Sequence, residues 1–221
     1  MTGPRSVLIV DPDAIFRLGL EELIRREEDF CVCGSFGDPA EATASEVVDH
    51  AEIAVTGLAF RDGQGLDAVR ALSSRIPEVP ALVLSSFDET YYADRALRAG
   101  AMGYVMKGTP PEQILGALRT MLSGRRYLSD RMVSRVLEGI AGQRPGQSSS
   151  PVDRLSDREI QILELLGQGL GTRDIAATLH LSVKTIENYR EHVKAKLSLR
   201  NSTELIRYAI IWVLERQRAR A

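Results

Sequence analysis

The residues best suited to a chemical task lie between Val183 and Leu197. At helical spacing, the apolar side chains of this stretch fall on one face, at Ile186, Val193 and Leu197. The rest of the surface is polar, comprising Lys184, Glu187, Asn188 and Glu191, with Arg190, Lys194 and Lys196 alongside. Lys and Arg bind DNA phosphates, Asn can pair with adenine, and Glu can accept from the amino group of cytosine. This face is therefore a candidate DNA-reading surface, and a solvated helix in a small bundle is the alternative.

The elements that must position this helix are marked by their start signals. Ser156 and Glu159 form a capping box, and the helix they open ends near Gly167. The polar residues expected to cap helices are, in chain order, Ser156, Thr172, Ser182 and Asn201 or Ser202. A tight turn at His180-Leu181 joins the second helix to the third. A short helix, a tight turn and a long polar helix can place the long helix in the major groove.

The same stretch resembles the LuxR-type helix-turn-helix. The matching segments are Leu155-Ser-x-Arg-Glu159, Leu165 with Gly169, Asp174-Ile-Ala176, Leu181-Ser-x-Lys-Thr-Ile186, His192-x-x-x-Lys196-Leu197 and Leu199-Arg-Asn. The resemblance implies a reading helix from Val183 to Leu197 and a fourth helix that often pairs two copies. By position, it implies that Glu187, Asn188 and Glu191 face bases, and that the phosphate backbone is contacted by Lys184, Thr185, Arg190 and Lys194. Lys196, at the edge of the helix, is expected to hold a phosphate as well.

The first 124 residues alternate short apolar runs with helical patterns. Strands are expected at 7–10, 30–35, 53–56, 81–85 and 103–106, and helices at 15–26, 39–48, 66–76, 90–99 and 111–123. This alternation predicts an α/β fold, a five-stranded parallel doubly wound sheet with helices on both faces. A separate all-α, four-helix domain follows it. Any site in the first domain should lie at the carboxyl ends of the strands.

Residues 5–124, which include Gly100-Ala-x-Gly-Tyr-Val-Met-Lys107, resemble the receiver domain of NarL/FixJ-type response regulators. In that family, paired carboxylates hold Mg²⁺ and an aspartate at the end of the third strand takes a phosphoryl group. A hydroxyl and a lysine bind the phosphoryl oxygens, because a hard cation and fixed positive charge stabilise the transferring group. By position, the residues that match are Asp11, Ser85, Lys107 and Tyr104, the aromatic that reports the active state.

Two positions depart from that pattern. Pro12 replaces the second carboxylate, with Asp13 one residue late, and Gly57 stands where the acceptor aspartate belongs. The sequence therefore predicts a degenerate pocket that has no phosphorylation site, no catalytic residue, no metal and no cofactor. The residues of this predicted pocket are Asp11, Asp13, Gly57, Ser85, Tyr104 and Lys107. We expect an ion pair between Asp11 and Lys107 that holds this pocket in one state. A solvent-exposed Lys107 is the alternative.

Charge separates the two halves of the chain. Residues 1–141 carry a net charge of -6 and residues 142–221 a net charge of +4, which favours a polyanion as partner of the second half. Cys31 and Cys33 are expected to be small buried hydrophobes in a reducing cytosol. No signal peptide or run of about 18 apolar residues is present, so a cytoplasmic protein without a membrane partner is expected.

Together these features predict a bacterial transcription regulator that is not an enzyme. The expected parts are a receiver-like domain at 1–124, a helical and flexible linker at 125–152 and a helix-turn-helix domain at 153–221. We expect it to bind promoter sites in double-stranded DNA as a homodimer, independently of aspartyl phosphorylation. Alternatives are a receiver regulated by a small molecule, or a heterodimer with an intact response regulator. A self-phosphorylating receiver is not expected, because Gly57 and Pro12 stand where its carboxylates belong. A scaffold that does not contact DNA is not expected either, because one module carries Lys184, Asn188 and Arg190.

Overall fold

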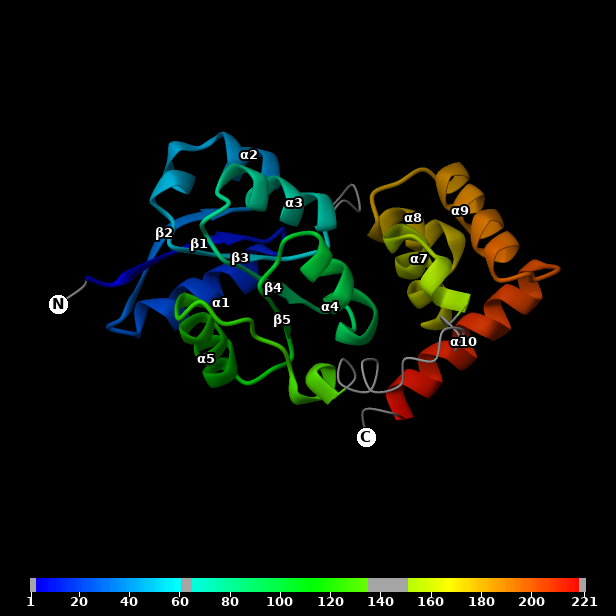
Figure 1. Ribbon diagram of the computed structural model, residues 1–221. Coiled ribbons are helices and arrows are strands. Elements are labelled where there is room, and N and C mark those ends of the chain that lie inside the picture. The colour runs from blue at the N-terminus through cyan, green and yellow to red at the C-terminus, as the bar shows by residue number, and fades with distance from the viewer. Residues whose placement is uncertain (1–2, 61–64, 135–150, 219–221) are drawn as a thin grey trace. The chain divides into compact units, whose positions relative to one another are not determined.

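The computed structural model describes residues 3–60, 65–134 and 151–218. The chain divides into two compact units, Met1–Gln143 and Arg144–Ala221 (Figure 1). The helix expected within the linker is described only over residues 130–134, which are helical, and the rest of that expectation lies outside the described residues.

The N-terminal unit is built on a parallel sheet with the strand order β2-β1-β3-β4-β5. The strands are β1 (Arg5–Val10), β2 (Phe30–Phe36), β3 (Ile53–Thr56), β4 (Ala81–Ser85) and β5 (Gly103–Met106). The predicted five-stranded parallel sheet is confirmed, because buried runs of β-branched and aliphatic residues form strands that are covered on both faces.

The helices of this unit cover both faces of the sheet (Figure 1). They are α1 (Ala14–Arg25), α2 (Pro39–Ala44), α3 (Gly65–Arg75), α4 (Glu89–Arg98) and α5 (Pro111–Leu122), with a 3₁₀ helix η1 (Glu46–His50). One core cluster joins the sheet to α1 and α5, and another joins its opposite face to α2 and α3. These layers hold the strand ends in a fixed arrangement.

One predicted helix was wrong in extent. The helix expected over 39–48 ends at Ala44, because Ser45 adopts an extended backbone and its Oγ accepts a hydrogen bond from Val47 N at 3.3 Å. A serine hydroxyl that binds a nearby amide competes with the helical ladder. The chain then restarts as η1.

The C-terminal unit contains α7 (Asp157–Gly167), α8 (Thr172–Thr178), α9 (Val183–Lys196) and α10 (Ser202–Arg218), preceded by a 3₁₀ helix η2 (Pro151–Arg154). The predicted capping box is present, with both Ser156 and Glu159 bonded to each other's backbone amides. Ser182 caps α9, as expected.

Two details of the helix starts differ from or refine the sequence expectation. Thr172 does not cap α8: it is the first helical residue, and Gly171 occupies the cap with its amide bonded to the Asp174 carboxylate at 3.3 Å. Asn201 is the cap of α10, since its Oδ1 accepts from Glu204 N at 2.9 Å. Between α8 and α9 the tight turn is made by His180, whose φ is 52°.

Candidate functional site

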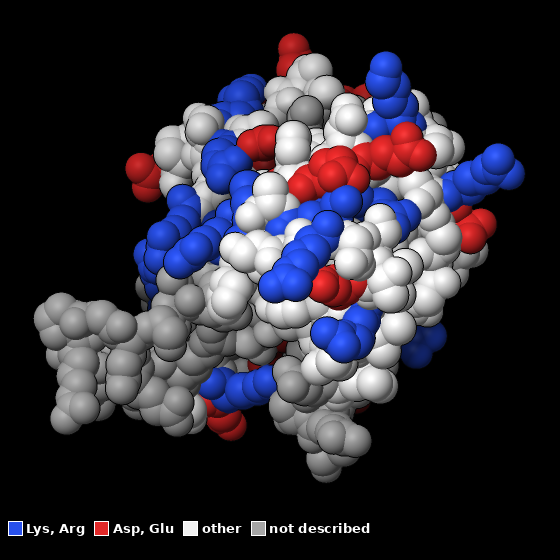
Figure 2. Space-filling view, turned by 90° about the vertical axis from the view of Figure 1, so that its right-hand side faces the viewer, with Lys and Arg blue, Asp and Glu red and all other residues white. Residues whose placement is uncertain are grey.

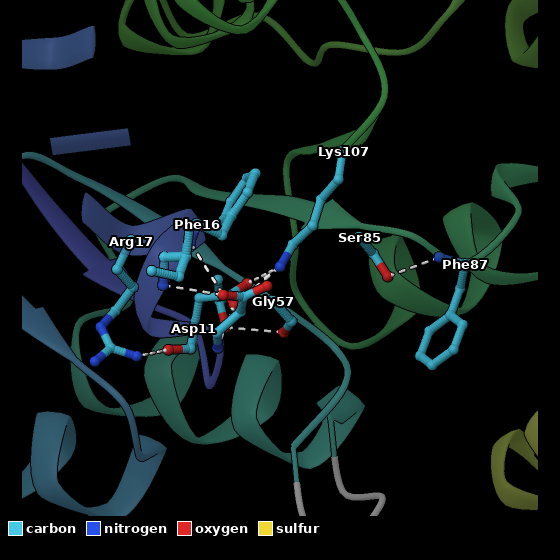
Figure 3. A network of polar contacts seen from close by, with 10 residues as sticks. Asp11, Phe16, Arg17, Gly57, Ser85, Phe87 and Lys107 are labelled. Atoms are coloured by element: carbon cyan, nitrogen blue, oxygen red, sulfur yellow. Dashed lines mark hydrogen bonds and ion pairs between the residues drawn. The ribbon is translucent and has the colours of Figure 1, made fainter. Parts of the chain in front are cut away.

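Asp11 is the buried centre of the pocket at the carboxyl ends of the strands. It follows β1 directly and is 2% exposed. Lys107 Nζ lies 2.9 Å from Asp11 Oδ1 and 2.8 Å from Oδ2, and Oδ1 also accepts from Asp13 N at 2.9 Å (Figure 3). The expected ion pair is therefore present, and Lys107 is not turned into solvent.

Two elements bring the lysine into place. Lys107 follows β5, and its amide donates to Ser85 O at 3.0 Å, which extends the pairing of β5 with β4. Its ammonium lies 3.9 Å from the centre of the Phe16 ring on α1. A cation over an aromatic face gains electrostatic attraction, so Lys107 is held by a carboxylate and a ring together.

Gly57 lies beside the Asp11 carboxylate. It follows β3, and its amide donates to Val10 O at 2.8 Å, which fixes it next to the end of β1. A Cβ added at Gly57 would lie 3.0 Å from Asp11 Cγ and closer still to Oδ2. The Asp11 carboxylate thus fills the space that a side chain at position 57 would enter.

The other residues predicted for this pocket have different partners. Asp13 caps α1, and its carboxylate accepts hydrogen bonds from Ile15 N at 3.0 Å and Phe16 N at 3.1 Å. These backbone hydrogen bonds, of which the one from Phe16 has the larger effect, hold the pKa of Asp13 below its usual value. Ser85 Oγ accepts from Phe87 N at 3.1 Å, and the buried Tyr104 hydroxyl donates to Phe87 O at 2.7 Å. Of the six residues, the structure brings together Asp11, Gly57 and Lys107, and Asp13 joins them through its backbone amide.

These donors do not fit Mg²⁺. Mg²⁺ requires several oxygen ligands in near-octahedral geometry, usually including one or two carboxylates. Here Asp11 faces an ammonium, Asp13 is committed to the helix cap, and Gly57 supplies no side chain.

Sequence reasoning missed two residues around Asp11, both on α1. The Arg17 guanidinium donates to Asp11 O, and Phe16 packs against the Lys107 ammonium (Figure 3). In the sequence, Phe16 is one of the apolar residues at helical spacing in the helix expected over 15–26, which is typical of a core residue. The available signal was position, because the helix after β1 begins three residues beyond Asp11 and its first turn must border the pocket.

The second candidate site is the surface of α9. Its core face is buried at Ile186, Val193 and Leu197, as expected. On the opposite side, the exposed polar members of the predicted set are Lys184, Glu187, Asn188, Glu191 and Lys196, while Thr185, Arg190 and Lys194 are half-buried. The tight turn before α9 is tied to the first helix by Arg158, whose guanidinium donates to Leu179 O at 3.0 Å.

Three of the four cations on α9 already have partners within the unit. Lys194 pairs with Glu191 at 2.8 Å, and Arg190 donates to Thr172 Oγ1. Lys196 Nζ lies 2.7 Å from Glu159 Oε2. Among the described residues, no such ion pair involves Lys184. Lys184 is therefore the cation of this helix most available to an external phosphate.

Glu159 and Arg158 are buried charged residues that sequence reasoning did not assign to the reading surface. Glu159 is 2% exposed; burial raises its pKa, but hydrogen bonds from Lys196 and Ser156 outweigh that effect and hold the pKa below its usual value. Arg158 is 7% exposed and also donates to Gln161 Oε1 at 2.7 Å. These bonds fix α9 and its preceding turn against α7.

The face of the molecule drawn in Figure 2 carries charges of both signs. Figure 2 shows Lys and Arg side chains over the face with acidic side chains gathered between them. Such a surface meets a polyanion at particular points rather than everywhere, because each acidic group repels phosphate. Across the described residues, no helix has the length and apolarity needed to cross a membrane.

Comparison with known proteins assigns both units. Residues 7–119 match the response regulator receiver domain, and residues 153–209 match the bacterial regulatory proteins of the luxR family. The oxygen regulatory protein NreC of Staphylococcus epidermidis is 32% identical over 210 residues, covering 93% of this chain and 96% of the relative.

Solved structures of response regulators share the fold. RcsB of Salmonella enterica serovar Typhimurium, bound to promoter rprA in the presence of phosphomimetic BeF3-, is 25% identical with a TM-score of 0.59, covering 93% of this chain and 98% of that one. A LuxR-family response regulator of Aurantimonas sp. is 26% identical with a TM-score of 0.57, covering 62% of this chain and 99% of that one. The chain therefore belongs to the response regulators that join a receiver domain to a helix-turn-helix domain of the luxR family.

Proposed function

We propose that this protein is a transcription regulator that binds promoter sites in double-stranded DNA through α9. The observation that carries the proposal is the exposed polar stripe of α9, set opposite its buried stripe and directly after a tight turn. A helix held in this way can enter the major groove with its polar face toward the base pairs. The RcsB relative, described as bound to a promoter, supports the same role.

Within this proposal the residues divide by task. Glu187, Asn188 and Glu191 face base edges, and Lys184 supplies the principal phosphate contact of α9. The half-buried or internally paired members, Thr185, Arg190, Lys194 and Lys196, stiffen the helix and reach phosphates only by giving up or sharing their present partners. Glu191 is itself paired with Lys194, which reduces its freedom to meet a base.

The experiment compares two substitutions on duplexes selected from random DNA by the full-length protein. Asn188→Ala should weaken the selected sequence by about 1–3 kcal/mol while leaving non-specific duplexes unchanged. Lys184→Ala should weaken all duplexes alike and reduce the slope of log K against log salt by about 1. A protein whose affinity for every duplex is negligible at low salt would refute the proposal.

We further propose that the protein acts as a dimer. The apolar residues Ile206, Ile210 and Leu214 lie four residues apart on α10 and are exposed at 40%, 38% and 49%. A line of exposed aliphatic side chains on one helix face suits pairing with the same face of a second copy. A heterodimer with an intact response regulator remains the alternative, and sedimentation of the purified protein separates the two.

The control of this regulator is proposed to be independent of aspartyl phosphorylation. The support is local: Gly57 offers no carboxylate, and Asp11 is closed off by Lys107. Intact mass after incubation with acetyl phosphate and Mg²⁺ should be unchanged, and gain of one labile phosphoryl group would refute the proposal. A small-molecule effector is less favoured, because the Asp11 carboxylate and the Lys107 ammonium occupy the pocket that such a ligand would need.

The domain limits at 1–124, 125–152 and 153–221 remain part of this proposal. Limited proteolysis should cut between residues 125 and 152 first, because residues 141–151 within this segment are rich in Gly, Ser and Pro. The two products should then fold separately. Cleavage that begins inside 5–124 would argue against those limits.

A further inference from the structure

Val183 is an exposed apolar residue on a helix that is otherwise polar on that side. It is the first residue of α9 and 40% exposed, whereas the core face of the helix is formed by Ile186 and Val193, both 0% exposed. Single exposed aliphatic residues are common on protein surfaces. What distinguishes Val183 is its position on the proposed reading helix.

Val183 continues the stripe that faces bases. Residues four apart on a helix lie one above the other, so Val183, Glu187 and Glu191 form a single line along the exposed side of α9. Residues at the N-terminal end of a reading helix contact base edges in the major groove. Val183 therefore lies on the line that meets the base pairs, one turn before Glu187.

The first turn of α9 is held firmly enough to position this side chain. Ser182 Oγ accepts from Thr185 N at 3.0 Å and lies 2.7 Å from Thr185 Oγ1. A β-branched valine in a helix strongly prefers one χ1 rotamer, so its two methyl groups point in a defined direction. The geometry is thus suited to one apolar contact rather than to a flexible surface.

We propose that Val183 contacts the C5-methyl group of a thymine in the bound DNA. In the major groove that methyl is the apolar feature that marks a T·A pair, and small aliphatic side chains recognise it. The inference rests on the proposed DNA-binding function and adds a base preference to it. It assigns to α9 an apolar contact beside the polar contacts of Glu187 and Asn188.

The test replaces each thymine of a selected duplex by deoxyuridine, which removes only the C5-methyl. For the unmodified full-length protein, one position per half-site should lose affinity about fourfold, the equivalent of burying one methylene (about 0.8 kcal/mol, at 1.4 kcal/mol per tenfold). Val183→Ala should bind the thymine and deoxyuridine duplexes equally at that position and keep the profile elsewhere. Alanine has the higher helix propensity, so the variant should fold.

The matched control is Ile15→Ala, which removes a 79% exposed aliphatic side chain from the N-terminal unit and should leave the whole profile unchanged. Identical deoxyuridine profiles for the unmodified protein and Val183→Ala would overturn the inference while leaving DNA binding intact. If the unmodified protein bound none of the duplexes, the proposed function itself would be refuted. The two failures are therefore distinguishable.

Discussion

Removing the Lys107 charge should destabilise the N-terminal unit more than any surface charge change. In Lys107→Met the Asp11 carboxylate, whose side chain is 3% exposed, would lose its counter-charge and keep one backbone hydrogen bond from Asp13. Breaking a buried pair by removing one partner costs about 3–5 kcal/mol. The Lys107 side chain is 18% exposed, so water can partly solvate the orphaned carboxylate, and we expect the lower end, about 3 kcal/mol.

A double-mutant cycle isolates the pair itself. Asp11→Asn combined with Lys107→Met removes both charges together, so it should cost less than the sum of the two single changes, with a coupling of about 2 kcal/mol. The surface pair of Arg98 and Asp94, 79% and 62% exposed, is the matched control. The same cycle there should give about 0.5 kcal/mol or less, because solvent screens exposed charges.

Urea unfolding with two probes makes the measurement specific to one unit. Trp212 is the chain's only tryptophan and lies on α10, so its fluorescence follows the C-terminal unit, while far-UV circular dichroism follows both. The Lys107 and Asp11 variants should lower the urea midpoint of the N-terminal unit, which circular dichroism reports. The midpoint of the tryptophan fluorescence transition should stay unchanged. Additive effects within about 0.5 kcal/mol would refute the reasoning, since they would mean that the buried contact contributes no pairwise energy.

Three further changes test other parts of the structure. Gly57→Ala should lower the free energy of unfolding by about 1–3 kcal/mol in the same urea assay, because the added Cβ would collide with Asp11. Gly19→Ala is the control: a Cβ there meets nothing within 4 Å, so this change should raise the free energy of unfolding by about 0.5–1 kcal/mol. Equal effects of the two changes would contradict the packing argument. Glu159→Gln should lower the stability of the C-terminal unit by about 2 kcal/mol at pH 7. The folded pKa of Glu159 is depressed, so this difference should shrink as pH falls below the unfolded value of about 4.3 and vanish below the folded pKa. A difference that does not shrink as pH falls below the unfolded value would exclude the ionised carboxylate as its source. Ile210→Lys should shift a dimer toward monomer in sedimentation, and an unchanged mass would place the contact elsewhere.

The fold was predictable because its signals are periodic. Buried runs separated by helical stripes specify a parallel sheet whatever the details of packing, and the observed strands agree with that pattern to within two residues at each end. The errors at Ser45 and Thr172 have a different origin. In both places the end of the helix depends on which side chain accepts a hydrogen bond from a nearby backbone amide. The acceptor is the Ser45 hydroxyl in one case and the Asp174 carboxylate in the other.

The pocket was predictable to the extent that residue types decide it. A lysine and a buried carboxylate that follow strands at the same edge of the sheet pair because neither tolerates burial alone, so Asp11 after β1 and Lys107 after β5 could be matched from the sequence. The contact of Phe16 with Lys107 could not, because an aromatic residue in an apolar stripe is equally consistent with the core. Its role depends on how the first turn of α1 sits beside the end of β5.

The reading helix shows most clearly what spacing cannot reveal. Lys196 and Glu159 are 37 residues apart, and nothing in either neighbourhood signals that they meet at 2.7 Å. Because ion pairs within the protein compete with any external phosphate, the positive charge counted along α9 overstates the charge that is free to bind a polyanion. If α9 binds DNA as proposed, Lys184 and exposed arginines outside α9, such as Arg173 and Arg200, are the cations best placed to contact phosphates, and the helix itself would serve discrimination more than affinity.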